Sequence, residues 1–388
     1  MGLKFKIKNA FKNLIDYCEK ENYKGWDPYD GLNSWVIQKT PLGKSRFFRL
    51  AWIQLFKHNP VNFRKLVGVK KEYNPKGLGL FLIGYCNLYT KENKKEYLDK
   101  IHFLSNEILQ LQTIGYSGAC WGYNFDWQAR AFFQPKFTPT VVATSFVVEA
   151  LLQAYEITHN EKLLQIAISS SNFILQDLNR TYDSNKNYTL SYSPLDETQV
   201  FNAGLLGAKT LCLIYKYNND KTLIREAKKI VDYVCSNQNL DGSWAYGTLP
   251  FHLWIDNFHT GYNLECIYIY QKISGDLTYR KNIDKGLDYY LNNFFTEEGM
   301  SKYYNNKTYP IDIHAPAQLV VTLAKMDILE EHKGLVEKVI GWTINNMQSQ
   351  QGYFYYQKRR VLSSEIPYIR WAQSWMFYAL SYYEIKIP

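Results

Sequence analysis

The sequence predicts an all-α fold, an (α/α)6 toroid in which six helical hairpins close into a ring with a period of about 56 residues. The first observation behind this prediction is a repeat. Loops rich in Tyr and Trp pass into long apolar segments near Thr140, Thr198, Asp256, Asp312 and Tyr368. These points are about 58, 58, 56 and 56 residues apart, and a further apolar segment occupies residues 76–92.

The second observation is the composition of each unit. A helix with a charged face comes first, as in residues 221–238, then a loop with Gly and aromatic residues, then a helix that is apolar nearly all round. Helices that are polar on one face lie outside, and helices that are apolar all round lie inside. Six outer–inner pairs favour a closed ring, and an open helical solenoid is the alternative.

In chain order, residues 1–72 are predicted to form a basic arm that contributes helices and a candidate lid, and residues 73–388 the toroid. The arm contains "GWDPYDGLNS" (25–34), with Asp27 and Asp30 around a Pro-Tyr turn. Residues 44–71 mix Arg and Lys with large apolar residues, which is typical of a helix that rests on an anionic bilayer. The alternative is that this segment is an outer helix of the toroid or an arm that packs against it.

The predicted topology gathers distant loops. In a ring of hairpins, every loop that leads from an outer to an inner helix lies at the same end. The segment "CWGYNFDWQAR" (120–130) therefore joins the loops before Thr198, Asp256, Asp312 and Tyr368 around one mouth. Because loops on a rigid scaffold carry function, this mouth is the predicted site.

Composition limits the classes of function. The aromatic content is 16%, with 33 Tyr, and the net charge of +9 allows an anionic partner. The six Cys form no C-x-x-C pair and are expected to be reduced thiols. No nucleotide-binding or acyl-enzyme motif occurs, and no basic stripe for nucleic acid is evident. No signal peptide and no transmembrane run are apparent, so we expect a cytoplasmic protein, with the inner membrane face as the alternative location.

Several motifs resemble known families. "SNQNLDGSWAYG" (236–247) resembles the Q-x-x-D-G-S-W repeat of terpenoid cyclases and protein prenyltransferases. The ring with an aromatic, acid-bearing mouth is similar to six-hairpin glycosidases, polysaccharide lyases and glucuronyl C5-epimerases. "GWDPYDGLNS", "DNFHTGYNLE" and "IPYIRWAQSWMFYAL" resemble bacterial proteins encoded among surface-polysaccharide genes. The resemblance implies a role in making or modifying a glycan, without assigning catalytic residues.

Sugar rings stack on aromatic faces while their hydroxyls pair with polar side chains, and the mouth supplies both. The candidate substrate-binding residues are Trp121, Tyr123, Trp127, Gln128, Tyr192, Glu197, Trp244, Tyr246, His252, Asp312, Tyr353, Arg359 and Trp371. The candidate catalytic residues are Asp126, Arg130, Asp256, His259, His314, Tyr368 and Arg370. We expect a carbohydrate partner, anionic or lipid-linked, and neither a cofactor nor a metal ion. Asp256, His259 and Cys266 are zinc ligands by type but do not share one helical face.

Two reaction types remain open. Hydrolysis needs two carboxyl groups across the scissile bond, with Asp126, Glu197, Asp256, Asp312 and Glu365 as candidates. Uronate lyase or C5-epimerase chemistry needs a base and cations that hold the carboxylate, and the histidines and arginines of the mouth favour it. The sequence therefore predicts an enzyme that modifies a bacterial surface polysaccharide or its lipid-linked precursor. A non-catalytic glycan-binding protein and a terpenoid cyclase or prenyltransferase-like enzyme are the alternatives.

Overall fold

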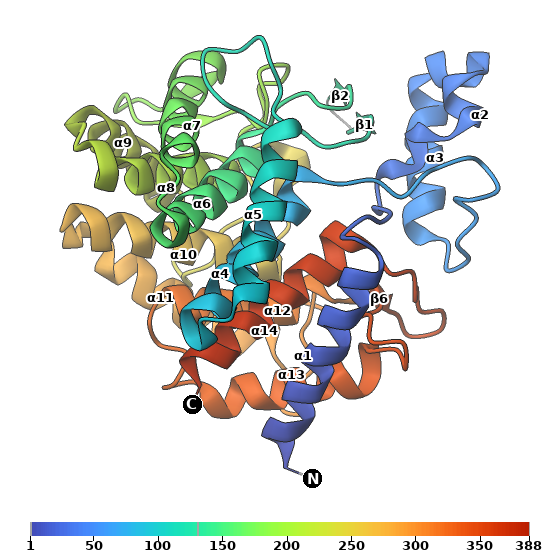
Figure 1. Ribbon diagram of the computed structural model, residues 1–388. Coiled ribbons are helices and arrows are strands. Elements are labelled where there is room, and N and C mark those ends of the chain that lie inside the picture. Colours follow the sequence, from blue (N-terminus) through green and yellow to red (C-terminus); the bar gives the residue numbers. More distant parts are fainter. Residues whose placement is uncertain (1, 130–131, 388) are drawn as a thin grey trace.

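The computed structural model describes residues 2–129 and 132–387, and these form two concentric rings of helices (Figure 1). The inner ring consists of α4 (Pro75–Glu92), α6 (Val141–Thr158), α8 (Phe201–Asn218), α10 (Asn257–Ser274), α12 (His314–Lys325) and α14 (Ser374–Lys386). The outer ring consists of α1 (Leu3–Lys20), α5 (Lys95–Gln110), α7 (Glu161–Asn172), α9 (Lys221–Ser236), α11 (Arg280–Phe294) and α13 (Lys333–Met347). Because α14 packs against α4, the ring closes. The predicted toroid is confirmed, and the open solenoid is excluded.

Burial explains which helices lie inside. Along α8 almost every side chain is buried, including polar ones, whereas α9 buries a single stripe that begins at Leu223 and repeats every three or four residues. Among the described residues, α6 is the one helix that is long and apolar enough to cross a membrane. However, 72% of this 18-residue segment is buried inside the molecule. Its apolar character therefore follows from its place in the inner ring.

Three of the inner helices, α4, α6 and α10, begin at a side chain that caps them. Thr140 accepts a hydrogen bond from the backbone N–H of Ala143 at 3.0 Å, and Asp256 accepts one from the backbone N–H of His259 at 3.0 Å. Such caps satisfy N–H groups that have no partner within the helix. The α14 helix has a different start, because a π-helical turn (Ile369–Gln373) precedes it. The repeat seen in the sequence is thus a repeat of helix N-termini.

The first hairpin is unusual because its connection is long. Residues 21–74 join the outer helix α1 to the inner helix α4 and contain the short α2 (Trp35–Gln38) and α3 (Arg46–His58). Because α1 packs against α13 and α14, the predicted boundary at residues 72/73 falls inside this hairpin. From here on, the arm denotes residues 31–71 alone, a part of the predicted N-terminal arm of residues 1–72. Figure 1 shows α2 and α3 set apart from the main body.

The β-strands are short and lie in the connections that lead from outer to inner helices. Three two-stranded sheets pair β1 (Trp127–Gln128) with β2 (Phe133–Gln134), β3 (Arg180–Tyr182) with β4 (Tyr188–Leu190), and β5 (Ile311–Asp312) with β6 (Gln357–Lys358). All six cysteines are unpaired thiols, as predicted.

Four charged residues form a cluster inside the ring. Lys209 of α8 donates to Glu149 of α6 at 2.9 Å and to Glu265 of α10 at 2.8 Å, and Lys325 of α12 contacts Glu149. All four side chains are at most 10% exposed. Buried charges are costly unless they are paired, so this cluster links four inner helices in one arrangement.

Candidate active site

A cavity of about 560 Å³ opens at the end of the toroid where outer helices lead into inner ones. Residues from all six hairpins line it, so the predicted convergence of distant loops at one mouth is confirmed. The predicted residues that reach the cavity wall are Tyr123, Trp127, Gln128, Tyr192, Tyr246, His252, His259, His314, Arg370 and Trp371. Their catalytic or binding roles stay predictions, because the structure holds no ligand.

The first turn of α10 holds a histidine in a fixed orientation. The Nδ1 of His259 lies 2.7 Å from a carboxylate oxygen of Asp256, and the same oxygen accepts a hydrogen bond from the indole of Trp254 at 2.9 Å. A carboxylate partner places the proton on Nδ1 and leaves Nε2 able to accept one. The imidazole is 20% exposed and lies against Tyr246, whose ring stacks on Trp254 with centroids 4.6 Å apart. Asp256 itself is buried behind the wall and positions His259.

A second histidine begins α12. The ring of His314 stacks on Phe258 with centroids 4.4 Å apart, and its Nε2 lies 2.8 Å from the hydroxyl oxygen of Tyr262. Its Nδ1 is buried without a hydrogen-bond partner among the described residues. Burial, followed by the nearby charge of Lys76, lowers the pKa of His314 well below its ordinary value. His314 is therefore a neutral imidazole at neutral pH. Phe258 lies next to both histidines, because its ring centroid is also 4.5 Å from that of His259.

Asp312, a predicted substrate-binding residue and a candidate carboxyl group for hydrolysis, does not line the cavity. It is fully buried and accepts hydrogen bonds from the indole of Trp371 at 2.8 Å, from Gln357 at 2.6 Å and from the backbone N–H of His314 at 3.0 Å. Burial raises the pKa of its carboxyl group, although these bonds oppose the rise. Asp312 thus orients two wall residues, Trp371 and His314.

An aspartate of the first hairpin pairs with an arginine of the last, where the ring closes. Arg370 of the π-helical turn donates two hydrogen bonds to the carboxylate of Asp27, at 2.6 and 2.8 Å. Its guanidinium lies over the rings of Tyr123 and Trp371, with centroid distances of 4.9 and 5.3 Å. Burial opposes the charge, but Asp27 outweighs it and holds the pKa of Arg370 above its ordinary value. The pair fixes a permanent cation in the cavity wall.

The sequence reasoning missed Lys76, the second residue of α4. Its Nζ is surrounded by the rings of Phe146 at 4.3 Å, Trp375 at 5.1 Å and Tyr262 at 5.6 Å, and none of the described residues offers it a hydrogen-bond acceptor. Burial, with the nearby Arg370, lowers the pKa of Lys76 well below its ordinary value. The available signal was a Lys directly before an uncharged run, residues 77–90, of an inner helix, because Lys is rarely buried.

The arm forms one side of the cavity through α3. Leu50, Ile53, Gln54 and Lys57 of this helix line the cavity, as does Tyr29 before it. Burial opposes the charge of Lys57, but Tyr29 and Asp312 outweigh it and raise its pKa, so a second cation is present.

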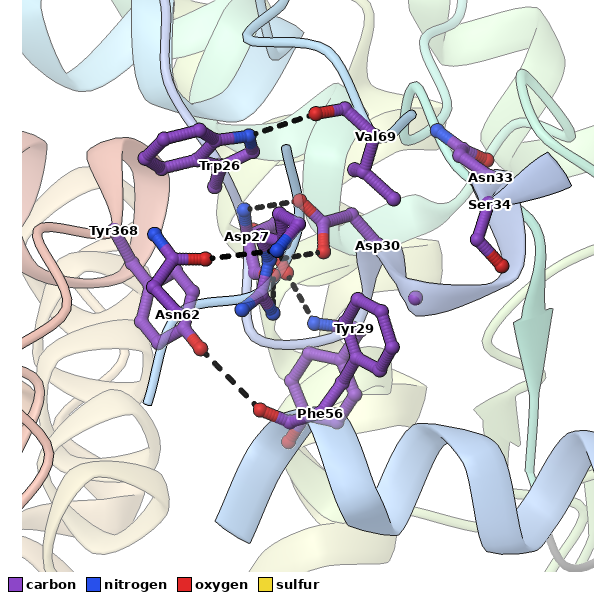
Figure 2. A network of polar contacts seen from close by, with 12 residues as sticks. Trp26, Asp27, Tyr29, Asp30, Asn33, Ser34, Phe56, Asn62, Val69 and Tyr368 are labelled. Atoms are coloured by element: carbon purple, nitrogen blue, oxygen red, sulfur yellow. Dashed lines mark hydrogen bonds and ion pairs between the residues drawn. The ribbon is translucent and has the colours of Figure 1, made fainter. Parts of the chain in front are cut away.

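A polar network joins the arm to the toroid, and Figure 2 shows it from close by. The carboxylate of Asp30 accepts from Arg64 at 2.7 Å and from the backbone N–H of Asp27 at 2.9 Å. The hydroxyl of Tyr368 donates to the carbonyl of Phe56 at 3.4 Å. Tyr368, a predicted catalytic residue, is fully buried in this network, where Arg64 lies over its ring, and does not line the cavity.

Two predicted sugar-stacking tryptophans belong to the repeat and not to the cavity. The indole of Trp121 donates to the carbonyl of Ile108 at 2.9 Å, and the indole of Trp244 donates to that of Val234 at 3.0 Å. Both carbonyls lie in the last turn of an outer helix, where the helix has no partner of its own for them. The motif that resembles the Q-x-x-D-G-S-W repeat therefore lies at the end of an outer helix, which its Trp244 caps by a hydrogen bond.

The other predicted residues outside the cavity wall lie around its rim or behind it. Asp126 accepts from Gln38 at 3.0 Å and from the backbone N–H of Lys136 at 2.7 Å, and Glu197 is exposed. Arg359 donates to the carbonyl of His58 at 2.9 Å, which ties the last loop to the end of α3. Tyr353 packs against Tyr17 of α1. Arg130 lies outside the described residues.

The wall has a distinctive balance of charge. Among the described residues, no Asp or Glu side chain lines the cavity, whereas four histidines, Lys57, Lys76 and Arg370 do. The carboxylates nearest to it, Asp27, Asp256 and Asp312, each accept hydrogen bonds from wall residues. Within the same described residues, no group of three or more His, Cys, Asp and Glu side chains is arranged to hold a metal ion.

Comparison with known proteins shows the fold. No family model matches the sequence, and no curated protein matches it. A cellobiose 2-epimerase from Bacillus thermoamylovorans has a similar structure, with a TM-score of 0.64 and 14% identity over 82% of this chain and 90% of that one. An unsaturated glucuronyl hydrolase specific for heparin has a TM-score of 0.64 and 14% identity over 99% and 97%. A D-mannose isomerase has a TM-score of 0.60 and 12% identity over 81% and 86%. The chain shares with them the six-hairpin α/α toroid.

Proposed function

We propose that this chain is a carbohydrate-active enzyme that removes a proton from a sugar carbon next to a carboxylate or carbonyl group, as uronate lyases and C5-epimerases do. One observation carries the proposal: two histidines from neighbouring inner helices, His259 and His314, face a cavity with no Asp or Glu in the described part of its wall. Such a wall supplies bases and cations for proton transfer at carbon.

In the proposed reaction, Asp256 holds His259 so that its Nε2 accepts the proton from C5 of a uronate. The electrons of the C–H bond move into the carboxylate group, and Arg370 and Lys57 stabilise the added negative charge. Return of a proton to the opposite face of C5 gives the epimer. Loss of the substituent at C4 gives an unsaturated sugar instead. His314, through Tyr262, and the amine of Lys76 are the candidate proton carriers on the other side.

The aromatic residues supply the surface for the sugar. Tyr246 and Trp254 form a stacked pair beside His259, and Trp127 and Trp371 lie elsewhere on the wall. Names of structurally similar proteins, such as an epimerase, an isomerase and a glucuronyl hydrolase, support a sugar substrate. The resemblance to proteins encoded among surface-polysaccharide genes leads us to propose a bacterial surface glycan, or its lipid-linked precursor at the cytoplasmic face of the membrane, as the substrate.

Glycoside hydrolysis is the second candidate because a hydrolase shares the fold. Hydrolysis normally uses two carboxyl groups on either side of the scissile bond. The described residues place no carboxyl group in the wall, and the same fact disfavours a cyclase that protonates an alkene with a carboxylic acid. Proton transfer at carbon therefore agrees better with the site.

Product analysis tests the proposal. The protein is incubated with uronate-containing oligosaccharides and, separately, with neutral reducing disaccharides, and the products are examined by mass spectrometry and NMR. An epimerase or isomerase changes stereochemistry or connectivity at constant mass, and a lyase yields two fragments, one of them unsaturated. Products that have gained a water molecule would identify a hydrolase, and unchanged saccharides that nevertheless bind would identify a binding protein. Either result would overturn the proposal.

A further inference from the structure

Exposed apolar side chains gather at the end of the molecule that carries the cavity. Among the described residues, the large exposed apolar side chains that lie elsewhere are only three: Leu3, Phe5 and Leu277. The arm and the other outer-to-inner connections hold the rest, among them Trp35, Phe47, Leu55 and Leu66 in the arm and Leu240 and Val361 in later connections. Scattered apolar residues are ordinary on a protein surface, but a concentration at one end marks an interaction face.

The arm has the most exposed of these residues. Phe47 of α3 is 83% exposed, and Leu66 is 82% exposed. On α3, Phe47, Ala51 and Leu55 recur every four residues and are all exposed, so they form one face of the helix. The neighbouring face, which includes Leu50 and Ile53, lines the cavity. The apolar face of α3 therefore lies beside the cavity mouth.

Charge is also concentrated in the arm. Residues 31–71 contain nine Lys and Arg and no Asp or Glu. The formal charge of this segment is therefore +9, which equals the net charge of the whole chain. In the rest of the chain, the number of Lys and Arg residues equals the number of Asp and Glu residues. The positive net charge of the protein therefore comes from the arm alone. Five of the nine cations are exposed on the arm surface: Lys39, Lys44, Arg46, Lys65 and Lys70. A surface that combines exposed apolar side chains with cations matches an anionic lipid bilayer.

We propose that the arm docks on an anionic membrane surface, with Phe47 and Leu66 inserted among the lipid headgroups and the exposed Lys and Arg against anionic phosphates. A second copy of the chain fits this surface less well, because two arms without acidic residues would repel each other. The placement of α3 then turns the cavity mouth toward the bilayer. A saccharide attached to a lipid carrier would reach the cavity directly, but that extension rests on the function proposed above, whereas docking does not.

Flotation with lipid vesicles tests docking without any sugar substrate. The full chain is mixed with phosphatidylcholine vesicles with or without phosphatidylglycerol, at low and high salt. We expect binding only to the anionic vesicles, and weaker binding at high salt, because salt screens charges. The double variant Lys44→Ser/Lys65→Ser should bind about 25-fold more weakly, at about fivefold for each cation lost. Phe47→Ser/Leu66→Ser should also lose binding.

Matched changes at the opposite end give the control. Leu277→Ser and Lys221→Ser alter an exposed apolar residue and an exposed cation away from the arm, so they should bind as the unaltered chain does. Thermal denaturation of each variant checks that folding is intact. Three results would each overturn the proposal: no binding to either vesicle, equal loss in the control variants, or a sedimentation experiment in which the arm variants abolish a dimer instead.

Discussion

Replacing Asp27 with Ala should destabilise the protein by about 3 kcal/mol. Asp27 is 4% exposed and Arg370 is 3% exposed, and they share two hydrogen bonds of 2.6 and 2.8 Å. Removal of one partner of a buried pair leaves a buried charge and costs about 3–5 kcal/mol. The lower value applies because Arg370 keeps its contacts with two aromatic rings and borders the cavity, from which water can reach it.

Urea denaturation followed by tryptophan fluorescence measures this loss. The double variant Asp27→Ala/Arg370→Met should recover at least about 2 kcal/mol relative to the sum of the two single variants, because it no longer buries an unpaired charge. Asp284→Ala serves as the matched control, since it breaks an exposed pair with Arg280 at 3.0 Å and should cost less than about 1 kcal/mol. A cost below about 1 kcal/mol for Asp27→Ala would refute the inference that Asp27 compensates the buried charge of Arg370.

Three further changes test other parts of the structure. Asp256→Asn should lower turnover by roughly 10³–10⁴-fold in an assay of product formation, because an amide can hold His259 in the wrong tautomer; activity within tenfold would argue against positioning by Asp256. The pKa of His314 is lowered by folding, so the unfolded chain binds more protons below about pH 6.5. The free energy of unfolding, measured in urea across a pH series, should therefore fall as the pH drops, by up to about 1.4 kcal/mol per pH unit for this histidine, and less steeply in His314→Gln. Lys209→Met should lower stability by about 3–5 kcal/mol in the same experiment, because two buried glutamates lose their shared cation; a loss under about 1 kcal/mol would contradict that.

Much of the fold could be predicted because local signals repeat along the chain. Thr140 and Asp256 cap inner helices, and the apolar helices that follow cannot lie at the surface. Connectivity alone then brings Tyr123, His259 and Arg370 to one cavity. These inferences need only the period and the polarity of each helix.

The rest depends on packing that the period does not encode. Trp121 and Trp244 follow a glycine in each repeat, and that position suits both a sugar platform and a helix end; only the indole hydrogen bonds to outer-helix carbonyls distinguish the two. The arm lies outside the repeat, so nothing in the spacing places α3 against the cavity. Lys76 was not predicted as a site residue, because the apolar residues that follow it in the sequence indicate the buried core of an inner helix.

The direct test of the central claim is exchange of a carbon-bound hydrogen with solvent. The protein is incubated in deuterium oxide with a uronate oligosaccharide, and NMR follows the hydrogen at C5. With the unaltered chain we expect C5 to lose its hydrogen to solvent, with deuterium in its place in an epimer and a double bond in its place in a lyase product. This loss should slow at least a hundredfold in His259→Asn, since a general base contributes roughly 10²–10⁴-fold. Turnover of the saccharide that leaves the original hydrogen on C5, or an equal rate of its loss in His259→Asn, would contradict the account.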